Sequence, residues 1–225
     1  MKHFPAIVAV AACAIFALAA PVAHADSSYG PLTVTVWTGT GVTDQADMTN
    51  MPSGTPNFTF TYNGPLDFTT SNPANTFADF FGSNVSGISS FTVGTESALL
   101  ADTMSTVGET GPGVINSYLS FTGTYTGGGA VSVSHDDGAS LYTGAGYTNT
   151  VFSSPAPTDE IASLGTLPTG TDVPFDLVYV ESNGEPSDLV VTGLTPTPEP
   201  GTIGLMALGL ISLAAVAYRG GVLGS

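Results

Sequence analysis

Short runs of β-branched and aromatic residues, separated by Gly, Asn, Pro, Ser or Asp, fill most of this chain of 225 residues. Runs of roughly four to eight such residues between turn residues are typical of strands. Leu119 and Phe121 alternate with Ser120 and Thr122, which places one strand face in a core and the other in water. We therefore predict one all-β domain, a β-sandwich of the jelly-roll kind, over residues 26–195. The expected strands are Leu32–Thr38, Asn57–Tyr62, Ile88–Val93, Asn116–Tyr125, Ala130–His135, Pro174–Glu181 and Leu189–Thr192.

The run Pro174–Glu181 differs from the others because apolar residues occupy both of its faces, Leu177 on one and Val178 on the other. A strand that is apolar on both sides belongs in the middle of a sheet. One short helix is expected at Thr76–Phe81, with Asn75 as its N-cap. No internal repeat and no long linker interrupts the body, so we expect a single folded unit.

The distribution of charge limits the possible partners. The formal net charge is −16, and the only basic residues are Lys2 and Arg219, so none lies between residues 3 and 218. A body without cations cannot neutralise phosphates, which argues against nucleic acid and against anionic lipid head groups as partners. Cations are the expected partners, and calcium suits clustered carboxylates. The single cysteine, Cys13, lies in the N-terminal apolar segment, which excludes a disulfide framework in the mature chain.

The N-terminal segment has the pattern of a secretory signal peptide over residues 1–25. A basic start is followed by the apolar run Phe4–Ala20, and Ala23 and Ala25 form an A-x-A cleavage pattern. We predict cleavage after Ala25. Two alternatives remain, an uncleaved N-terminal anchor and a lipoprotein-like box that ends at Cys13.

The C-terminal segment has the pattern of a membrane anchor. Pro198, Glu199 and Pro200 precede an uncharged stretch over residues 201–218, and Arg219 follows it. At ~1.5 Å per residue this stretch gives a helix of about 27 Å, close to a bilayer core of roughly 30 Å. The positive-inside rule predicts Arg219 on the cytoplasmic side and the body outside. The alternative is a buried core helix, which an all-round apolar segment at the chain end disfavours.

At these residues the chain resembles the PEP-CTERM family of sorting signals. The resemblance covers the tail, residues 196–225, and implies insertion in the inner membrane and processing by an exosortase. It also implies delivery to the cell surface or to an extracellular matrix. The chain departs from the family pattern after Arg219, where Gly220–Ser225 replaces the usual basic cluster.

A pair of adjacent carboxylates ends one of the expected strands. Asp136 and Asp137 follow His135 directly and precede Gly138. Two neighbouring carboxylates with no Lys or Arg nearby repel each other unless a cation lies between them, which suggests a calcium site. The alternative is a hairpin turn, because Asp-Gly favours such turns.

Over Gly123–Leu189 the sequence also resembles the carbohydrate-binding β-sandwich domain of protective antigen and the flocculins. In that family a strand leads into two consecutive aspartates, and the lectin members bind calcium that contacts sugar hydroxyls. The resemblance implies that Asp136 and Asp137 are metal ligands and that Asn183, in the loop after the later strand, completes the site. Glu181 and Glu185 are the next candidates in the same region.

Two further residues are more simply assigned to the structure than to a function. His135 could be a base or a ligand, but a hydrogen-bonded strand-end histidine is the commoner case, and Trp37 more often packs in a core than against a sugar. No spacing of catalytic residues stands out. We therefore expect a non-enzymatic surface protein with a calcium-assisted glycan site, possible partners being extracellular polysaccharides. The alternatives are a structural matrix protein without a ligand site and a glycoside-active enzyme.

Overall fold

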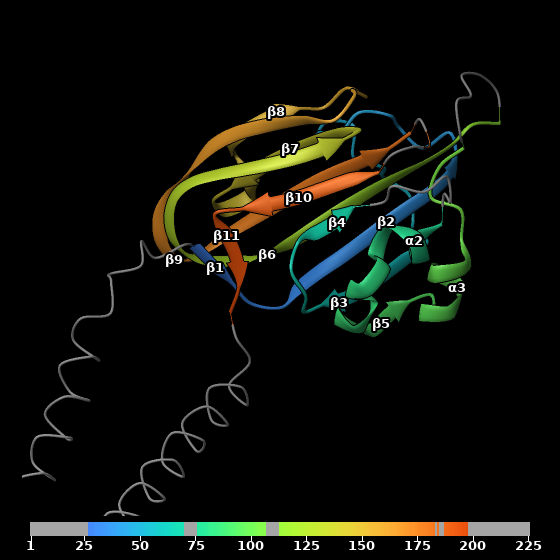
Figure 1. Ribbon diagram of the computed structural model, residues 1–225, viewed down its shortest axis with the longest axis horizontal. Coiled ribbons are helices and arrows are strands. Elements are labelled where there is room, and N and C mark those ends of the chain that lie inside the picture. The colour runs from blue at the N-terminus through green and yellow to red at the C-terminus, as the bar shows by residue number, and fades with distance from the viewer. Residues whose placement is uncertain (1–26, 70–75, 107–112, 183, 185–186, 198–225) are drawn as a thin grey trace, which may run out of the picture.

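The computed structural model describes residues 27–69, 76–106, 113–182, 184 and 187–197 (Figure 1). The predictions on residues 1–25, on Asn183 and Glu185, and on the span at 201–218 lie outside these residues. The strands are β1 (Ser27–Tyr29), β2 (Leu32–Thr40), β3 (Phe58–Tyr62), β4 (Asp67–Thr69), β5 (Ile88–Val93), β6 (Ile115–Asp136), β7 (Gly138–Thr143), β8 (Asn149–Ser154), β9 (Ile161–Glu181), β10 (Asp188–Thr192) and β11 (Leu194–Pro196). The helices are α2 (Phe77–Phe81) and α3 (Glu96–Ala101), with short 3-10 turns at Gly82–Gly87 and Ala145–Tyr147.

Two long strands, β6 of 22 residues and β9 of 21 residues, run through both layers of the fold. They pair antiparallel, and their register shifts at Gly127 and Gly129, where β6 bends. Gly127, Gly128 and Gly129 all have φ between 123° and 157°, a backbone region that favours glycine. The first half of β6 belongs to the sheet β5-β3-β2-β6-β9-β7-β8, whereas its second half pairs with β10, which pairs with β4.

The core lies between these two layers. Val34, Phe121 and Leu177 from one layer and Val133 and Leu189 from the other belong to a single buried cluster. Phe68 of β4 stacks on Phe121 of β6 across the interior, with ring centroids 5.9 Å apart. The inner faces of two sheets thus meet in one core, which confirms the predicted all-β sandwich.

The predicted strand positions are confirmed, and Ile88–Val93 has the predicted bounds, but β6 and β9 are much longer than expected. The strands expected at Asn116–Tyr125 and Ala130–His135 are one continuous strand, β6, because the glycines between them bend the chain without ending the ladder. The N-cap of α2 is Thr76, whose hydroxyl accepts from the backbone N–H of Asp79, so the expectation of Asn75 was wrong. The helix α3 was not predicted at all.

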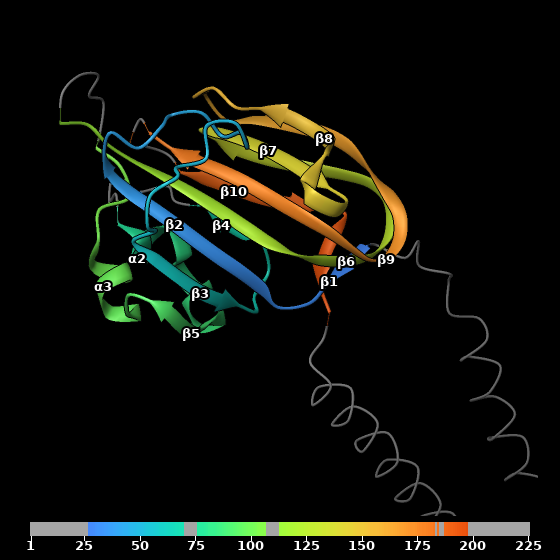
Figure 2. The same cartoon turned by 180° about the vertical axis from the view of Figure 1, so that it is seen from behind.

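The outer face of the larger sheet carries a second, smaller apolar cluster with Val178, Tyr118 and Tyr142. The connection between β2 and β3 runs over this face (Figure 2). It is held there by hydrogen bonds such as the one from Tyr118 Oη to the carbonyl of Asp47, at 3.0 Å. Trp37 packs edge-on against Tyr118 and donates its ring N–H to a backbone carbonyl, which agrees with a packing role.

The first and last described strands lie side by side at the end of the sandwich where β6 bends. β1 pairs in parallel with β11 and antiparallel with the middle of β6. We call this region, with Gly127–Gly129, β1 and β11, the bend end. Within the described part of the chain, no helix has the length and apolar character needed to cross a membrane.

Candidate metal site at the acidic end

Asp136 and Asp137 lie at the end of β6, where the chain leaves one layer and enters β7 of the other. β7 pairs with β8 and β9 and not with β6, so the hairpin-turn alternative was wrong. The peptide bond between the two aspartates is cis. Asp136 is 8% exposed and Asp137 only 1%, so both carboxyl groups lie largely inside the protein.

Asp137 connects β6 to the chain that follows β9. Its Oδ2 accepts from the backbone N–H of Ser182 at 2.8 Å and from the Ser182 hydroxyl at 3.1 Å. Its backbone carbonyl lies 2.6 Å from Nδ1 of His135. A carbonyl only accepts, so Nδ1 carries the proton and Nε2 accepts from the Ser163 hydroxyl at 2.9 Å. His135 is therefore a hydrogen-bonded strand-end histidine, the commoner of the two cases expected from the sequence, and burial lowers its pKa.

Asp136 lies in a strongly acidic environment. Burial raises the pKa of its carboxyl group to about 7, and Asp137, Asp159, Asp188 and Glu160 add to the effect through their charges. Asp188 lies directly opposite Asp136 in the β6–β10 ladder. No residue that the structure describes donates a hydrogen bond to the Asp136 carboxylate. Like charges opposite each other on two strands destabilise a sheet, so this carboxylate needs a proton or a cation.

Glu181 organises the other side of the site. Its carboxyl group accepts from the hydroxyls of Tyr179 at 2.7 Å and of Ser105 at 3.2 Å, and from the N–H of Gly184 at 3.1 Å. The Tyr179 hydroxyl also contacts the backbone carbonyl of Asp136. Burial, and then the charge of Asp137, raise the pKa of Glu181 to about 8. This network fixes the start of the loop that contains Asn183.

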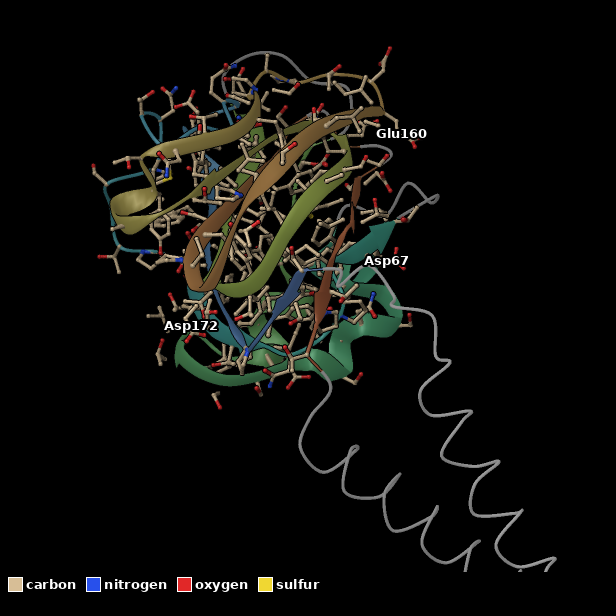
Figure 3. The ribbon with its side chains drawn as sticks, turned by 90° about the vertical axis from the view of Figure 1, so that its left-hand side faces the viewer. Asp67, Glu160 and Asp172 are labelled. Atoms are coloured by element: carbon tan, nitrogen blue, oxygen red, sulfur yellow. The ribbon has the colours of Figure 1, made fainter. Side chains whose placement is uncertain are left out.

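These groups define the acidic end, formed by Asp136, Asp137, Asp159, Glu160, Glu181 and Asp188. Figure 3 shows Glu160 and Asp172 at opposite ends of the body, and Asp172 lies at the end where β11 finishes. The acidic end and the bend end therefore face away from each other.

The donor set suits a hard cation, although it is small. Among the described residues, no group of three His, Cys, Asp or Glu side chains converges as metal ligands do. The two aspartates supply carboxylate oxygens, and calcium accepts backbone carbonyls, amide oxygens and water in its remaining positions. The observation that fits a cation best is that no described residue donates a hydrogen bond to the Asp136 carboxylate.

The sequence did not indicate Asp188, Asp159 or Glu160 as parts of this region. Asp188 directly precedes an expected strand, but only the strand register places it opposite Asp136. Asp159 and Glu160 lie just before β9, and their closeness to Asp136 depends on the β6–β9 pairing. The sequence could have indicated that Asp188 lies at the end of a strand, but it could not indicate that Asp136 lies opposite.

Comparison with known proteins assigns the tail. Residues 196–219 match the model of the PEP-CTERM protein-sorting motif, which confirms the prediction from Pro198, Glu199 and Pro200. The chain is thus an exported, membrane-anchored protein that an exosortase processes for the cell surface. No curated protein sequence matches the chain.

Two solved structures are similar to the body. One is a PA14 sugar-binding domain from an RTX adhesin, with a TM-score of 0.46 and 13% identity over 72% of this chain and 87% of that one. The other is the PA14 domain of the antifreeze protein MpAFP, with a TM-score of 0.46 and 13% identity over 72% of this chain and 81% of that one.

Proposed function

We propose that the body is a non-enzymatic, calcium-assisted glycan-binding module that its sorting tail delivers to the cell surface. The observation that supports this most is the Asp136 carboxylate. Asp136 is 8% exposed and lies opposite Asp188, and its carboxylate accepts no hydrogen bond from a described residue. The sequence has no Lys or Arg between residues 3 and 218 that could neutralise it.

Calcium is the cation that this chemistry favours. The available ligands are oxygens, and extracellular calcium modules work at roughly 10⁻⁴–10⁻³ M. Asp136 and Asp137 would hold the ion, with Asn183 as the amide ligand from the loop that Glu181 and Ser182 anchor. A bound calcium ion would supply open coordination positions for a pair of sugar hydroxyls.

The position of the acidic end is consistent with a ligand site on a surface protein. The sorting motif starts at residue 196, in β11, at the bend end. The acidic end lies at the opposite end of the body (Figure 3), so it points away from β11, in which the sorting motif begins. A site in this position can reach a glycan while the tail is still in the membrane.

Binding to immobilised polysaccharides tests the proposal. Residues 26–197 would be applied to neutral, amino and acidic polysaccharides in calcium and in chelator, beside Asp136→Asn and Asp137→Asn. Asp172→Asn is the matched control, because it removes one carboxylate at the opposite end and asparagine tolerates the φ of 52° found there. We expect calcium-dependent binding that the control keeps and the two site variants lose. Binding of no polysaccharide would support a structural matrix role, and bond cleavage would identify an enzyme.

A further inference from the structure

The sorting motif does not start beyond the fold but inside its sheet. Pro196, the first matched residue, is the last residue of β11 and lies opposite Tyr29 of β1. The N–H of Thr197 donates to the carbonyl of Tyr29 at 2.7 Å, so the ladder continues one residue past the strand. β11 therefore carries the ordered sheet across residue 195, the predicted end of the body, and into the first residues of the sorting motif.

This arrangement leaves almost no spacer between the body and the motif. Pro198, Glu199 and Pro200 follow Thr197 directly. Three residues reach at most ~10–11 Å when fully extended, at about 3.3–3.6 Å each. A single helix with its side chains is already about 10–12 Å thick. Any enzyme whose cleft encloses these three residues must therefore bring the wall of that cleft against the body.

The surface that such a wall would meet contains a recess of about 390 Å³. Thr197 lines it, together with Gly30 and Pro31 from the β1–β2 connection and Asp172 from the bend of β9. Its walls are held in place: the Asp172 N–H donates to Thr126 Oγ1 at 3.3 Å, and the Tyr29 hydroxyl donates to the Gly64 carbonyl at 2.9 Å. The recess is thus a preformed part of the folded body.

We propose that this recess at the bend end is a docking surface for the exosortase that processes the tail. The enzyme then recognises the folded body together with the sorting motif. The tail leaves from the rim of the recess, and its first residues are too short to hold the enzyme away from it. Processing of this chain then depends on β1 and β11 being paired. An unfolded body presents the motif without this surface and is a poorer substrate.

Gly30 allows the recess to be filled without disturbing the fold. A Cβ built on Gly30 meets no atom within 4 Å, and its backbone is not in the left-handed region. Gly30→Leu should therefore fold normally while its side chain occupies the docking surface. Gly54→Leu is the matched control, since Gly54 has the same freedom and does not line the recess.

The experiment follows processing of the full chain by pulse-chase in cells that contain an exosortase. We expect Gly30→Leu to slow processing by about tenfold, which corresponds to the loss of roughly 1.4 kcal/mol of contact. Gly54→Leu should be processed like the unmodified chain. Signal-peptide cleavage and the thermal melt of the body should be the same for all three. Equal processing of Gly30→Leu and the unmodified chain would overturn the proposal.

A flexible spacer distinguishes docking from steric obstruction by the body and from an indirect effect of the substitution. Twelve Gly/Ser residues inserted between Thr197 and Pro198 give an r.m.s. span of about 17–21 Å, which exceeds the thickness of one helix. With the spacer, the Gly30→Leu and unmodified bodies should be processed at one common, slower rate. Faster processing with the spacer would mean that the body is only an obstacle. A Gly30→Leu defect that persists with the spacer would mean that the substitution acts elsewhere; either result rejects the docking surface.

Discussion

The two ends of this body are stabilised in different ways. At the bend end, backbone hydrogen bonds join β11 to β1 and β1 to β6, and among the described residues that line the recess only Asp172 has a charged side chain. At the acidic end, several carboxylates lie close together, and the side-chain carboxylate of Asp136 accepts no hydrogen bond from a described residue. The chain completes the bend end by itself, whereas the acidic end requires a proton or a cation from solution.

The strongest test of this contrast removes β11. Chains that end at Thr197 and at Gly193 both lack the membrane anchor, but only the second lacks β11. Leu194 is 2% exposed, so its loss costs about 1.5–3 kcal/mol, and each lost ladder hydrogen bond costs about 1 kcal/mol. We expect the shorter chain to be less stable by about 4 kcal/mol in urea denaturation. Equal midpoints would mean that the bend end does not depend on its last strand.

Asp176 provides a carboxyl group that a cation cannot easily reach. It is 0% exposed on β9, its Oδ1 accepts from the Ser120 hydroxyl at 2.9 Å, and its Oδ2 has no hydrogen-bond partner. Burial raises its pKa from 3.8 to about 6. The folded state therefore holds the proton more tightly than the unfolded state, and stability from this group is lost as pH rises from about 4 through 6.

Asp176→Asn should remove this pH dependence. A shift of this size corresponds to about 3 kcal/mol, so the variant should be more stable than the parent by up to that amount at pH 7 to 8 and equal to it near pH 4. Urea denaturation of residues 26–197 across this pH range provides the measurement. Calcium should not change the difference in stability between Asp176→Asn and the parent at any pH. A variant that is less stable than the parent at pH 7 would show that the ionised carboxylate is satisfied in a way the described contacts do not reveal.

The sequence predicted the local structure well because the preference of a residue for a strand or a turn depends mainly on its near neighbours in the sequence. Leu119 and Phe121 face the core and Val178 faces the second cluster, as their alternation indicated. The expectation that Ser120 on the opposite face lies in water was wrong, because Ser120 is buried and donates to Asp176. The sequence could not predict that β6 continues through Gly127–Gly129, because a run of glycines is also typical of a loop that ends a strand. Continuity there depends on the long pairing with β9.

The same difference accounts for the candidate site. Asp136 and Asp137 could be predicted as site residues because they are adjacent in the sequence and because the carbohydrate-binding family that the sequence resembles has such a pair. Asp188 was not visible, because its position opposite Asp136 depends on the register between β6 and β10. The sheet extension at Thr197 also depends on a contact with the other end of the chain. Long-range pairing, which no local pattern encodes, produced each of these features.

Calcium should stabilise the acidic end and nothing else. At about a hundred times its dissociation constant, calcium adds roughly 2.7 kcal/mol to folding, which raises the melting temperature by about 5–11 °C for a body of this size. Thermal melts in calcium and in chelator provide the measurement. Asp136→Asn should lose the calcium effect and should melt above the parent in chelator, because it removes repulsion with Asp188. Asp172→Asn should keep the full effect, and a calcium response in the Asp136→Asn protein would place the ion elsewhere.

The smallest expected effect concerns the charge of the glycan. Asp159 and Glu160 are exposed at the rim of the acidic end, where they act on Asp136 through their charge. One calcium ion carries two positive charges, so the rim remains negative after it binds. We therefore expect neutral polysaccharides to bind about tenfold more tightly than uronate-rich ones at low salt, a difference of roughly 1.4 kcal/mol. The difference should shrink at 1 M salt, where the screening length is about 3 Å compared with about 10 Å at 0.1 M.

The double variant Asp159→Asn, Glu160→Gln should reduce the preference for neutral polysaccharides, while Asp172→Asn should leave it unchanged because Asp172 lies at the bend end. Tighter binding of the uronate-rich polysaccharide would show that calcium, and not the acidic rim, determines which glycans this end accepts.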